Sequence, residues 1–99
     1  MHPAEKLRAL LASPELLQAP GAYDALTARL IEAAGFPVCY MTGYGTAATY
    51  GVSDTGIIGF PEMLANASRI AKATQVPLIA DADTGYDDPA ETTRAYEAA

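Results

Sequence analysis

The sequence predicts an α/β protein built around a parallel sheet. Three short apolar segments, each of strand length, alternate with segments whose apolar residues recur every three or four positions. A strand that is buried on both faces shows a continuous apolar run, and helical crossovers then join neighbouring parallel strands. No linker-like stretch divides the 99 residues, so we expect one structural unit.

The first elements are a short helix, a strand and a second helix. Residues 3–11 form an amphipathic helical pattern that ends before Pro14. Residues 16–21 predict a short strand that runs into a turn. Asp24 then stands at the N-cap of a helix that Gly35 closes. The expected core face of this helix consists of Leu26, Leu30, Ile31 and Ala34.

The rest of the chain repeats the order of strand and helix. Residues 36–42 form an apolar run that predicts a buried strand, and a glycine-punctuated stretch follows at 43–59. Pro61 opens the next helix, residues 76–82 predict the third strand, and residues 88–91 form a capping box for the last helix. The expected core face of the helix after Pro61 consists of Met63, Leu64, Ala67, Ile70 and Ala71.

Composition and charge argue against several classes of protein. A net charge of −6, with only six scattered Lys and Arg residues, argues against a nucleic-acid partner. No apolar run approaches the roughly 18 residues of a membrane helix, and the N-terminus lacks an apolar leader. Cys39 is the single cysteine, which fits a reducing compartment, and its place within a strand predicts inert packing. We therefore expect a cytoplasmic protein without a membrane partner.

Two aspartates near the end of the third predicted strand are the strongest candidates for a functional site. Alternation along a strand would place Asp81 and Asp83 on one face, with Ala82 opposite. Because two carboxylates this close repel each other, either one keeps a proton or a cation lies beside them. Oxygen ligands suit Mg²⁺ or Mn²⁺ better than zinc. The alternative is that both residues only cap the following loop through Asx-turns.

The stretch at 43–59 carries two further patterns. Asp54 is a third candidate acid, because loops at the carboxyl ends of parallel strands carry function, although it could also be a simple turn residue. Residues 43–48 match the dinucleotide-binding pattern G-x-G-x-x-A, but Gly51 and Gly56 interrupt the helix that this fold requires. The backbone N–H groups of this loop could instead hold a substrate carboxylate or phosphate.

Four segments occur in an order and spacing that resemble the isocitrate lyase/phosphoenolpyruvate mutase superfamily. They are Pro20–Arg29, Tyr40–Gly43, Asp54 and Asp81–Tyr86. The resemblance implies a (β/α)₈ TIM barrel, of which this chain would cover about the first three βα units. Residues 1–99 would then be the N-terminal part of a single barrel domain, in keeping with a sequence that ends within a helical pattern and that we expect to be truncated.

The resemblance also implies roles for individual residues. Asp81 and Asp83 would hold Mg²⁺, with Mn²⁺ as the alternative ion, and Asp54 would act on the metal through water. Asp54 and Tyr40 would be catalytic residues. The residues that would meet a small carboxylate substrate are Tyr40, Thr42, Gly43 and Tyr44.

The chain departs from the family pattern at three positions, and two of these departures, at Tyr44 and Asp87, bear most on these roles. Tyr44 stands where methylisocitrate lyases carry glycine, which would change the size and polarity of the substrate pocket. Asp87 also replaces a usual glycine and would add negative charge near the metal. Thr42 stands where serine is more common and keeps the hydroxyl.

The activity that the resemblance implies is a Mg²⁺-dependent carbon–carbon bond lyase. Its substrate would be a small 2-hydroxy or 2-oxo di- or tricarboxylate of the 2-methylisocitrate, dimethylmalate or oxaloacetate type, cleaved through an enolate. One alternative is a phosphonomutase that forms a P–C bond, and another is an inactive truncated fragment. The full-length family members are typically homotetramers.

Overall fold

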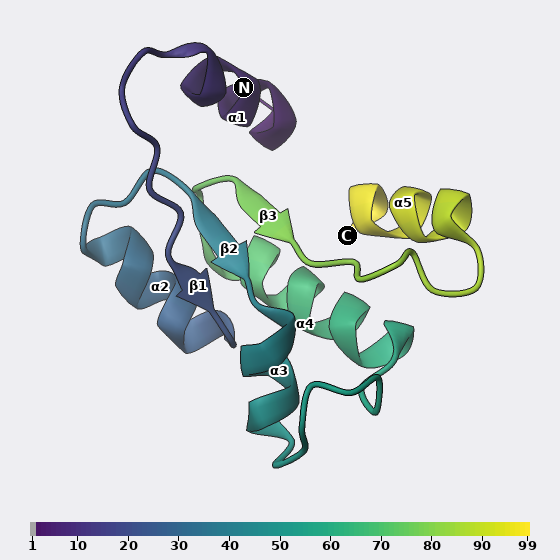
Figure 1. The fold of residues 1–99 in the computed structure, drawn as a ribbon. Coiled ribbons are helices and arrows are strands. Elements are labelled where there is room, and N and C mark those ends of the chain that lie inside the picture. Colours follow the sequence, from purple (N-terminus) through teal and green to yellow (C-terminus); the bar gives the residue numbers. More distant parts are fainter. Residues whose placement is uncertain (1) are drawn as a thin grey trace.

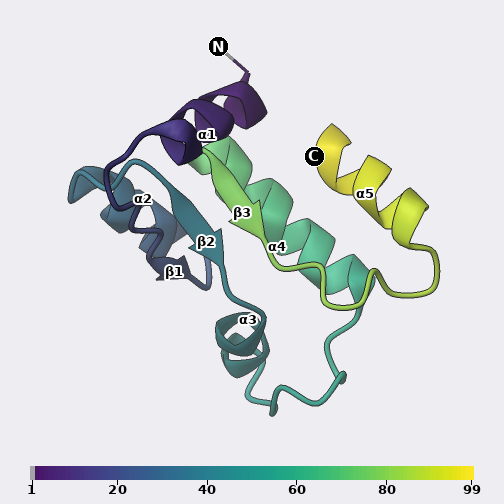
Figure 2. The same ribbon diagram turned by 45° about the horizontal axis from the view of Figure 1, so that its top comes forward.

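The computed structural model describes residues 2–99, which form a three-stranded parallel sheet with helices packed on one face and around its ends (Figure 1). Figure 2 shows α2 and α4 side by side behind the sheet, with α3 just beyond the carboxyl end of β2. The elements in chain order are α1 Pro3–Ala12, β1 Gly21–Ala22, α2 Ala25–Ala33, β2 Cys39–Met41, α3 Gly43–Thr49, α4 Phe60–Ala73, β3 Leu78–Ala80 and α5 Pro89–Ala98.

The predicted parallel sheet is confirmed, with strand order β1-β2-β3 and both pairs parallel. The strands are shorter than the predicted segments. In particular, the strand expected over 16–21 is wrong, because only Gly21 and Ala22 pair with β2. Pro20 lies just before β1; its carbonyl oxygen accepts a hydrogen bond from the Tyr40 N–H, but it has no N–H of its own to donate. Pro37 and Pro77 lie just before β2 and β3 and also lack an N–H.

The core lies between the sheet and helices α2 and α4. The face predicted for α2 is partly wrong: Leu26 and Leu30 are 67% and 60% exposed, whereas Ala28 is fully buried. The small Ala28 side chain lets the helix lie close to its neighbours, so the two leucines point away from the sheet. The buried cluster consists of Ala22, Ala28, Cys39, Met41, Met63, Ala67 and Ile70.

Helix α4 buries most of the residues that were predicted to form its core face. Met63, Ala67 and Ile70 are buried as expected, but Ala71 is exposed and Asn66 is buried instead. The Asn66 Nδ2 donates to the Tyr23 carbonyl oxygen at 3.0 Å and to Thr46 Oγ1 at 3.1 Å. A polar side chain therefore joins α4 to α3 and to the end of β1.

The helix ends follow local chemistry. Asp24 and Thr27 form a reciprocal capping box at the start of α2, and Gly35 follows its end with a φ of 95°. Asp88 accepts from the backbone N–H groups of Ala90 and Glu91, but the structure gives only this half of the predicted capping box. No helix within residues 2–99 has the length and apolar character needed to cross a bilayer.

The glycine-punctuated stretch contains a helix that the sequence did not predict. Helix α3 begins directly after β2, where the Thr42 hydroxyl accepts from the Gly45 N–H at 3.1 Å and caps the first turn. It ends after two turns at Tyr50, and Gly51 has a φ of 74°. The loop of residues 50–59 then returns to the start of α4.

Candidate active site

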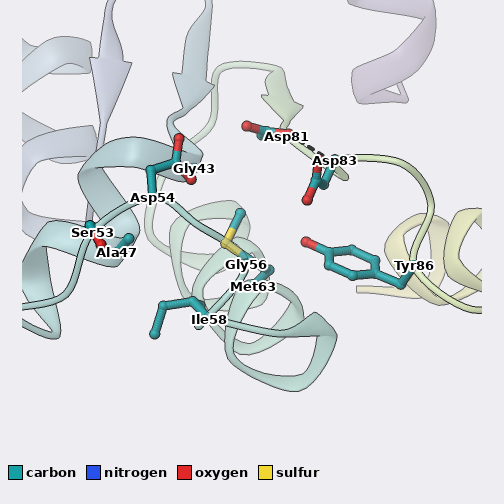
Figure 3. Close-up of a pocket in the computed structure, with 10 residues that line it drawn as sticks. All are labelled: Gly43, Ala47, Ser53, Asp54, Gly56, Ile58, Met63, Asp81, Asp83 and Tyr86. Carbon is teal, nitrogen blue, oxygen red and sulfur yellow. Dashed lines mark hydrogen bonds between the residues drawn. The ribbon is translucent and has the colours of Figure 1, made fainter.

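A cavity of about 90 Å³ lies beyond the carboxyl ends of β2 and β3, where α3, the loop of residues 50–59 and the start of α4 meet (Figure 3). It has room for several water molecules. Its lining consists of Gly43, Ala47, Ser53, Asp54, Gly56, Ile58, Met63, Asp81, Asp83 and Tyr86. All three predicted acids therefore face one space, and none of the lining residues is a lysine or arginine.

Asp81 is the most firmly held of these acids. Its backbone N–H donates to the Met41 carbonyl oxygen at 3.3 Å, which extends the pairing of β3 by one step. Its own carbonyl oxygen accepts from the Tyr96 hydroxyl at 3.2 Å. The carboxylate Oδ1 accepts from the Asp83 N–H at 2.8 Å, and Oδ2 lies 3.5 Å from the Tyr40 hydroxyl.

Gly43 creates the space that the Asp81 carboxylate occupies. A Cβ atom placed on Gly43 would stand 2.5 Å from Asp81 Oδ2 and 3.3 Å from Cγ, closer than side-chain packing permits. Glycine at the first position of α3 therefore allows the carboxylate to lie against the helix backbone.

Asp83 reaches the cavity by a different route from the one predicted. The expected strand alternation is wrong, because β3 ends at Ala80 and Asp83 has a left-handed φ of 50°. Because β2 ends at Met41, Asp83 has no paired strand residue whose hydrogen bonds would hold it in an extended conformation. The Asx-turn alternative is present in the bond from the Asp83 N–H to Asp81. Figure 3 nevertheless shows the Asp83 carboxylate directed into the cavity, towards the Tyr86 hydroxyl.

Asp54 enters the cavity from the opposite direction. It lies in the exposed loop between α3 and α4, and Figure 3 shows it near Gly43, across the cavity from Tyr86. The pKa of the Tyr40 hydroxyl is raised by burial first, then by the charge of Asp81 and the hydrogen bond to it, and last by the charge of Asp54. Tyr40 therefore remains a protonated hydrogen-bond donor at neutral pH.

Two more tyrosines lie beside the acids. Burial is the largest cause of the raised pKa of Tyr86, a hydrogen bond with Tyr96 lowers it, and the charges of Asp83 and Asp81 add to the increase. Burial also raises the pKa of Tyr96, with a further contribution from Tyr86. The ring of Phe60 lies 5.5 Å from that of Tyr86 and 6.1 Å from that of Tyr96. This aromatic cluster forms one wall behind the segment that carries Asp81 and Asp83.

Of the four residues predicted to bind substrate, only one lines the cavity. Gly43 lines the cavity, and Tyr40 reaches it only through its contact with Asp81. The Thr42 hydroxyl accepts the α3 cap bond and keeps its own proton free to donate. Tyr44 lies on α3, is 72% exposed and does not line the cavity. The predicted inert packing of Cys39 is confirmed, because the residue is fully buried.

The donor set fits a hydrated Mg²⁺ ion better than a metal held by protein atoms alone. Within residues 2–99, no three His, Cys, Asp or Glu side chains come close enough to hold one ion together. Mg²⁺ in proteins commonly keeps several waters and binds directly to only one or two carboxylates. The space left by Gly43 beside Asp81, and an all-oxygen set of acids, meet that requirement.

Parallel strands with acids gathered beyond their carboxyl ends are typical of α/β enzymes, both TIM barrels and open sheets. The family model described as phosphoenolpyruvate phosphomutase matches residues 7–99. The chain therefore belongs to the phosphoenolpyruvate mutase/isocitrate lyase superfamily, and the resemblance found in the sequence is confirmed.

Similarity to individual named proteins supports this family assignment. The 2,3-dimethylmalate lyase of Eubacterium barkeri is 46% identical over 103 residues, which cover 100% of this chain and 36% of that protein. The solved phosphoenolpyruvate phosphomutase from Streptomyces platensis subsp. rosaceus superposes with a TM-score of 0.92 at 39% identity, over 98% of this chain and 35% of that one.

A phosphonopyruvate hydrolase solved with oxalate and Mg²⁺ superposes with a TM-score of 0.90 at 36% identity, over 99% of this chain and 36% of that one. These structures are of the TIM-barrel type, which confirms the predicted fold class. The chain spans about a third of the length of the relatives that it matches.

Proposed function

We propose that this chain forms the first part of a Mg²⁺-dependent carbon–carbon bond lyase. The substrate would be a small 2-hydroxy or 2-oxo di- or tricarboxylate of the 2-methylisocitrate, dimethylmalate or oxaloacetate type. The observation that carries the proposal is the fixed carboxylate of Asp81, held against Gly43 in a cavity that two further acids line. The 46% identity with a dimethylmalate lyase supports cleavage of a C–C bond.

In this proposal Asp81 and Asp83 hold the metal, either directly or through water, and Asp54 orients a water between the metal and the loop. The bound ion would supply a Lewis acid that stabilises the negative charge of an enolate as the C–C bond breaks. Mn²⁺ would serve the same residues, because it accepts the same oxygen ligands.

The substrate carboxylate would lie at the start of α3. There the backbone N–H groups of Gly43 and Tyr44 and the hydroxyls of Tyr40 and Thr42 would donate to it. Tyr40 suits this role because its raised pKa keeps the proton in place beside two acids. The ring of Tyr44 is exposed and lies outside the cavity, so of this residue only the backbone N–H would take part.

A second candidate is a phosphonomutase that forms a P–C bond. The close superposition on a phosphoenolpyruvate phosphomutase, at a TM-score of 0.92, favours it. Both reactions need the same acids, because both develop negative charge on a 2-oxo acid. They differ in the bond that changes, because the lyase breaks a C–C bond and the mutase exchanges an O–P bond for a P–C bond, so product analysis separates them.

The experiment assays the full-length natural polypeptide that carries these residues. With Mg²⁺ present, we expect 2-methylisocitrate, dimethylmalate or oxaloacetate to be cleaved into two shorter carboxylates, followed by chromatography, and cleavage to stop when EDTA removes the metal. Phosphonopyruvate formed from phosphoenolpyruvate, seen as a P–C resonance by phosphorus NMR, together with no C–C cleavage, would establish the second candidate and refute the first.

For residues 1–99 alone we propose an inactive species. The three-stranded sheet has two unpaired edges, at β1 and β3, and an exposed pair of leucines, Leu26 and Leu30, on α2. We further propose that the full-length protein works in the cytoplasm as a homotetramer. Cleavage of any of the three substrates by purified residues 1–99 would contradict the proposed inactivity.

A further inference from the structure

Helix α5 is tied to the segment after β3 by two side-chain hydroxyls. Tyr96 donates to the carbonyl oxygen of Asp81 at 3.2 Å, and Thr92 donates to the carbonyl oxygen of Gly85 at 2.8 Å. The two donors stand four residues apart and therefore share one face of the helix. Figure 2 shows α5 alongside α4, with the segment after β3 looping out to reach it.

We infer that Tyr96 is a positioning residue that fixes the backbone of Asp81 and so sets the direction of its carboxylate. The inference rests on the proposed function, because it concerns the residue that we assign to the metal. Tyr96 does not line the cavity and would not touch substrate or metal. It would act through Asp81, and its hydroxyl also meets that of Tyr86, which lines the cavity.

The position of Asp81 at the end of the sheet explains why a side-chain donor is needed. The Asp81 N–H still donates to the Met41 carbonyl oxygen. Because β3 has ended, however, the Asp81 carbonyl oxygen accepts no hydrogen bond from a neighbouring strand. Tyr96 supplies that donor. With the peptide groups on both sides of its Cα held, the Cα–Cβ bond has one direction, and Oδ2 comes to lie against Gly43.

A second contact depends on the same peptide group. The Asp83 N–H donates to Asp81 Oδ1 at 2.8 Å, and Asp83 has a left-handed φ of 50°. Rotation of the peptide between Asp81 and Ala82 would break this bond and turn Asp83 away from the cavity. The Tyr96 hydroxyl therefore supports the placement of both acids.

The ring and the hydroxyl of Tyr96 can be separated by substitution. The ring packs on Phe60 with centroids 6.1 Å apart and an interplanar angle of 28°. Tyr96→Phe keeps this packing and removes only the hydroxyl. Thr92→Val removes a comparable hydroxyl bond from the same helix to the same segment, but at Gly85. Thr93→Val removes the exposed hydroxyl bond to Pro89, which lies within the helix.

The test measures Mn²⁺ binding by electron paramagnetic resonance in the full-length natural polypeptide and its variants. Metal-free thermal unfolding is recorded beside it, and amide exchange of residues 81–86 gives a readout that needs no metal. We expect Tyr96→Phe to weaken Mn²⁺ binding about tenfold, as loss of a partner that orients a ligand does. It should also speed amide exchange at Asp83, whereas Thr93→Val should change neither quantity.

The comparison with Thr92→Val separates positioning from general loosening of the loop. We expect Thr92→Val to unfold at a lower temperature than the wild type. Its Mn²⁺ affinity should nevertheless remain higher than that of Tyr96→Phe. Wild-type Mn²⁺ affinity in Tyr96→Phe, or an equal loss of affinity in Thr92→Val, would overturn the inference. Asp81→Asn tests the underlying assignment separately: if it binds Mn²⁺ as the wild type does, the proposed metal site itself is wrong.

Discussion

The Oδ2 atom of Asp81 lies 2.5 Å from the point where a Cβ atom of Gly43 would stand. The end of β3 and the start of α3 thus meet at a contact that admits a carboxylate but no additional methyl group. The two residues are 38 positions apart in sequence (81 minus 43), and only the parallel pairing of β2 with β3 brings them together.

Gly43→Ala should weaken metal binding while leaving the helix intact. Alanine at an ordinary helical position is about 1 kcal/mol more favourable than glycine, so without the clash the variant would be more stable. With the clash, the Asp81 carboxylate must move, and we expect Mg²⁺ affinity to fall at least about tenfold. Isothermal titration measures the affinity.

A matched glycine controls for this substitution. A Cβ on Gly21 of β1 would have its nearest neighbour at 3.7 Å, which is ordinary contact. Gly21→Ala should therefore bind Mg²⁺ like the wild type. Equal affinities in Gly43→Ala and the wild type would show that Asp81 does not contribute to the metal site in the observed conformation.

Stability should fall at alkaline pH because three part-buried tyrosines have raised pKa values. Tyr40, Tyr86 and Tyr96 all hold their protons more tightly in the folded chain than in the unfolded chain. Above the ordinary tyrosine pKa of about 10 the unfolded state loses these protons first, so the free energy of unfolding decreases as pH rises. Below pH 10 the contribution is fully present.

Urea unfolding between pH 8 and 11 checks this dependence (the range brackets the ordinary pKa of about 10). Tyr96→Phe removes one of the three groups and should reduce the slope by at most about 1.4 kcal/mol per pH unit. Tyr44→Phe is the matched control for the loss of a hydroxyl, because that ring is 72% exposed, and at pH 8 its free energy of unfolding should stay within about 0.5 kcal/mol of the wild type. A stability that rises with pH above 10 would contradict the assigned direction of the shifts.

Asn66→Ala should destabilise the fold through the loss of two hydrogen bonds. The Asn66 Nδ2 joins Tyr23 and Thr46, and the side chain is 7% exposed, so its partners would be left unsatisfied. We expect a loss of about 1–3 kcal/mol in the free energy of unfolding. Lys72→Ala, an exposed change on the same helix, should lie within about 0.5 kcal/mol of the wild type in the same urea titration. A loss no larger than that of the control would show that the Asn66 contacts are not stabilising.

Local patterns in the sequence predicted the order of strands and helices because each depends on near neighbours. Asp24 and Asp88 were correctly identified as N-caps, since a cap acts within three residues of its own position. Which face of α2 packs against the sheet was not predictable in the same way. Leu26 and Leu30 carry the apolar pattern, but close packing selected the small Ala28 for the sheet side.

The candidate site was predictable in its acids and not in what holds them. Asp81 and Asp83 could be found because two acids at a strand end are unusual, although the path of the backbone at Asp83 was predicted wrongly. Tyr96 gave no signal in the sequence, because its bond to Asp81 spans the loop that precedes α5. Contacts of this kind depend on the tertiary arrangement, which residue spacing alone does not encode.

Direct measurement of metal binding tests the central claim. The full-length natural polypeptide, Asp81→Ala, Asp83→Ala and the exposed control Glu97→Gln on α5 are titrated with Mg²⁺ and Mn²⁺ in the absence of substrate. The account predicts metal binding that falls more than about tenfold in each of the first two variants and is retained in Glu97→Gln, which does not line the cavity. Wild-type affinity in both Asp81→Ala and Asp83→Ala would contradict it.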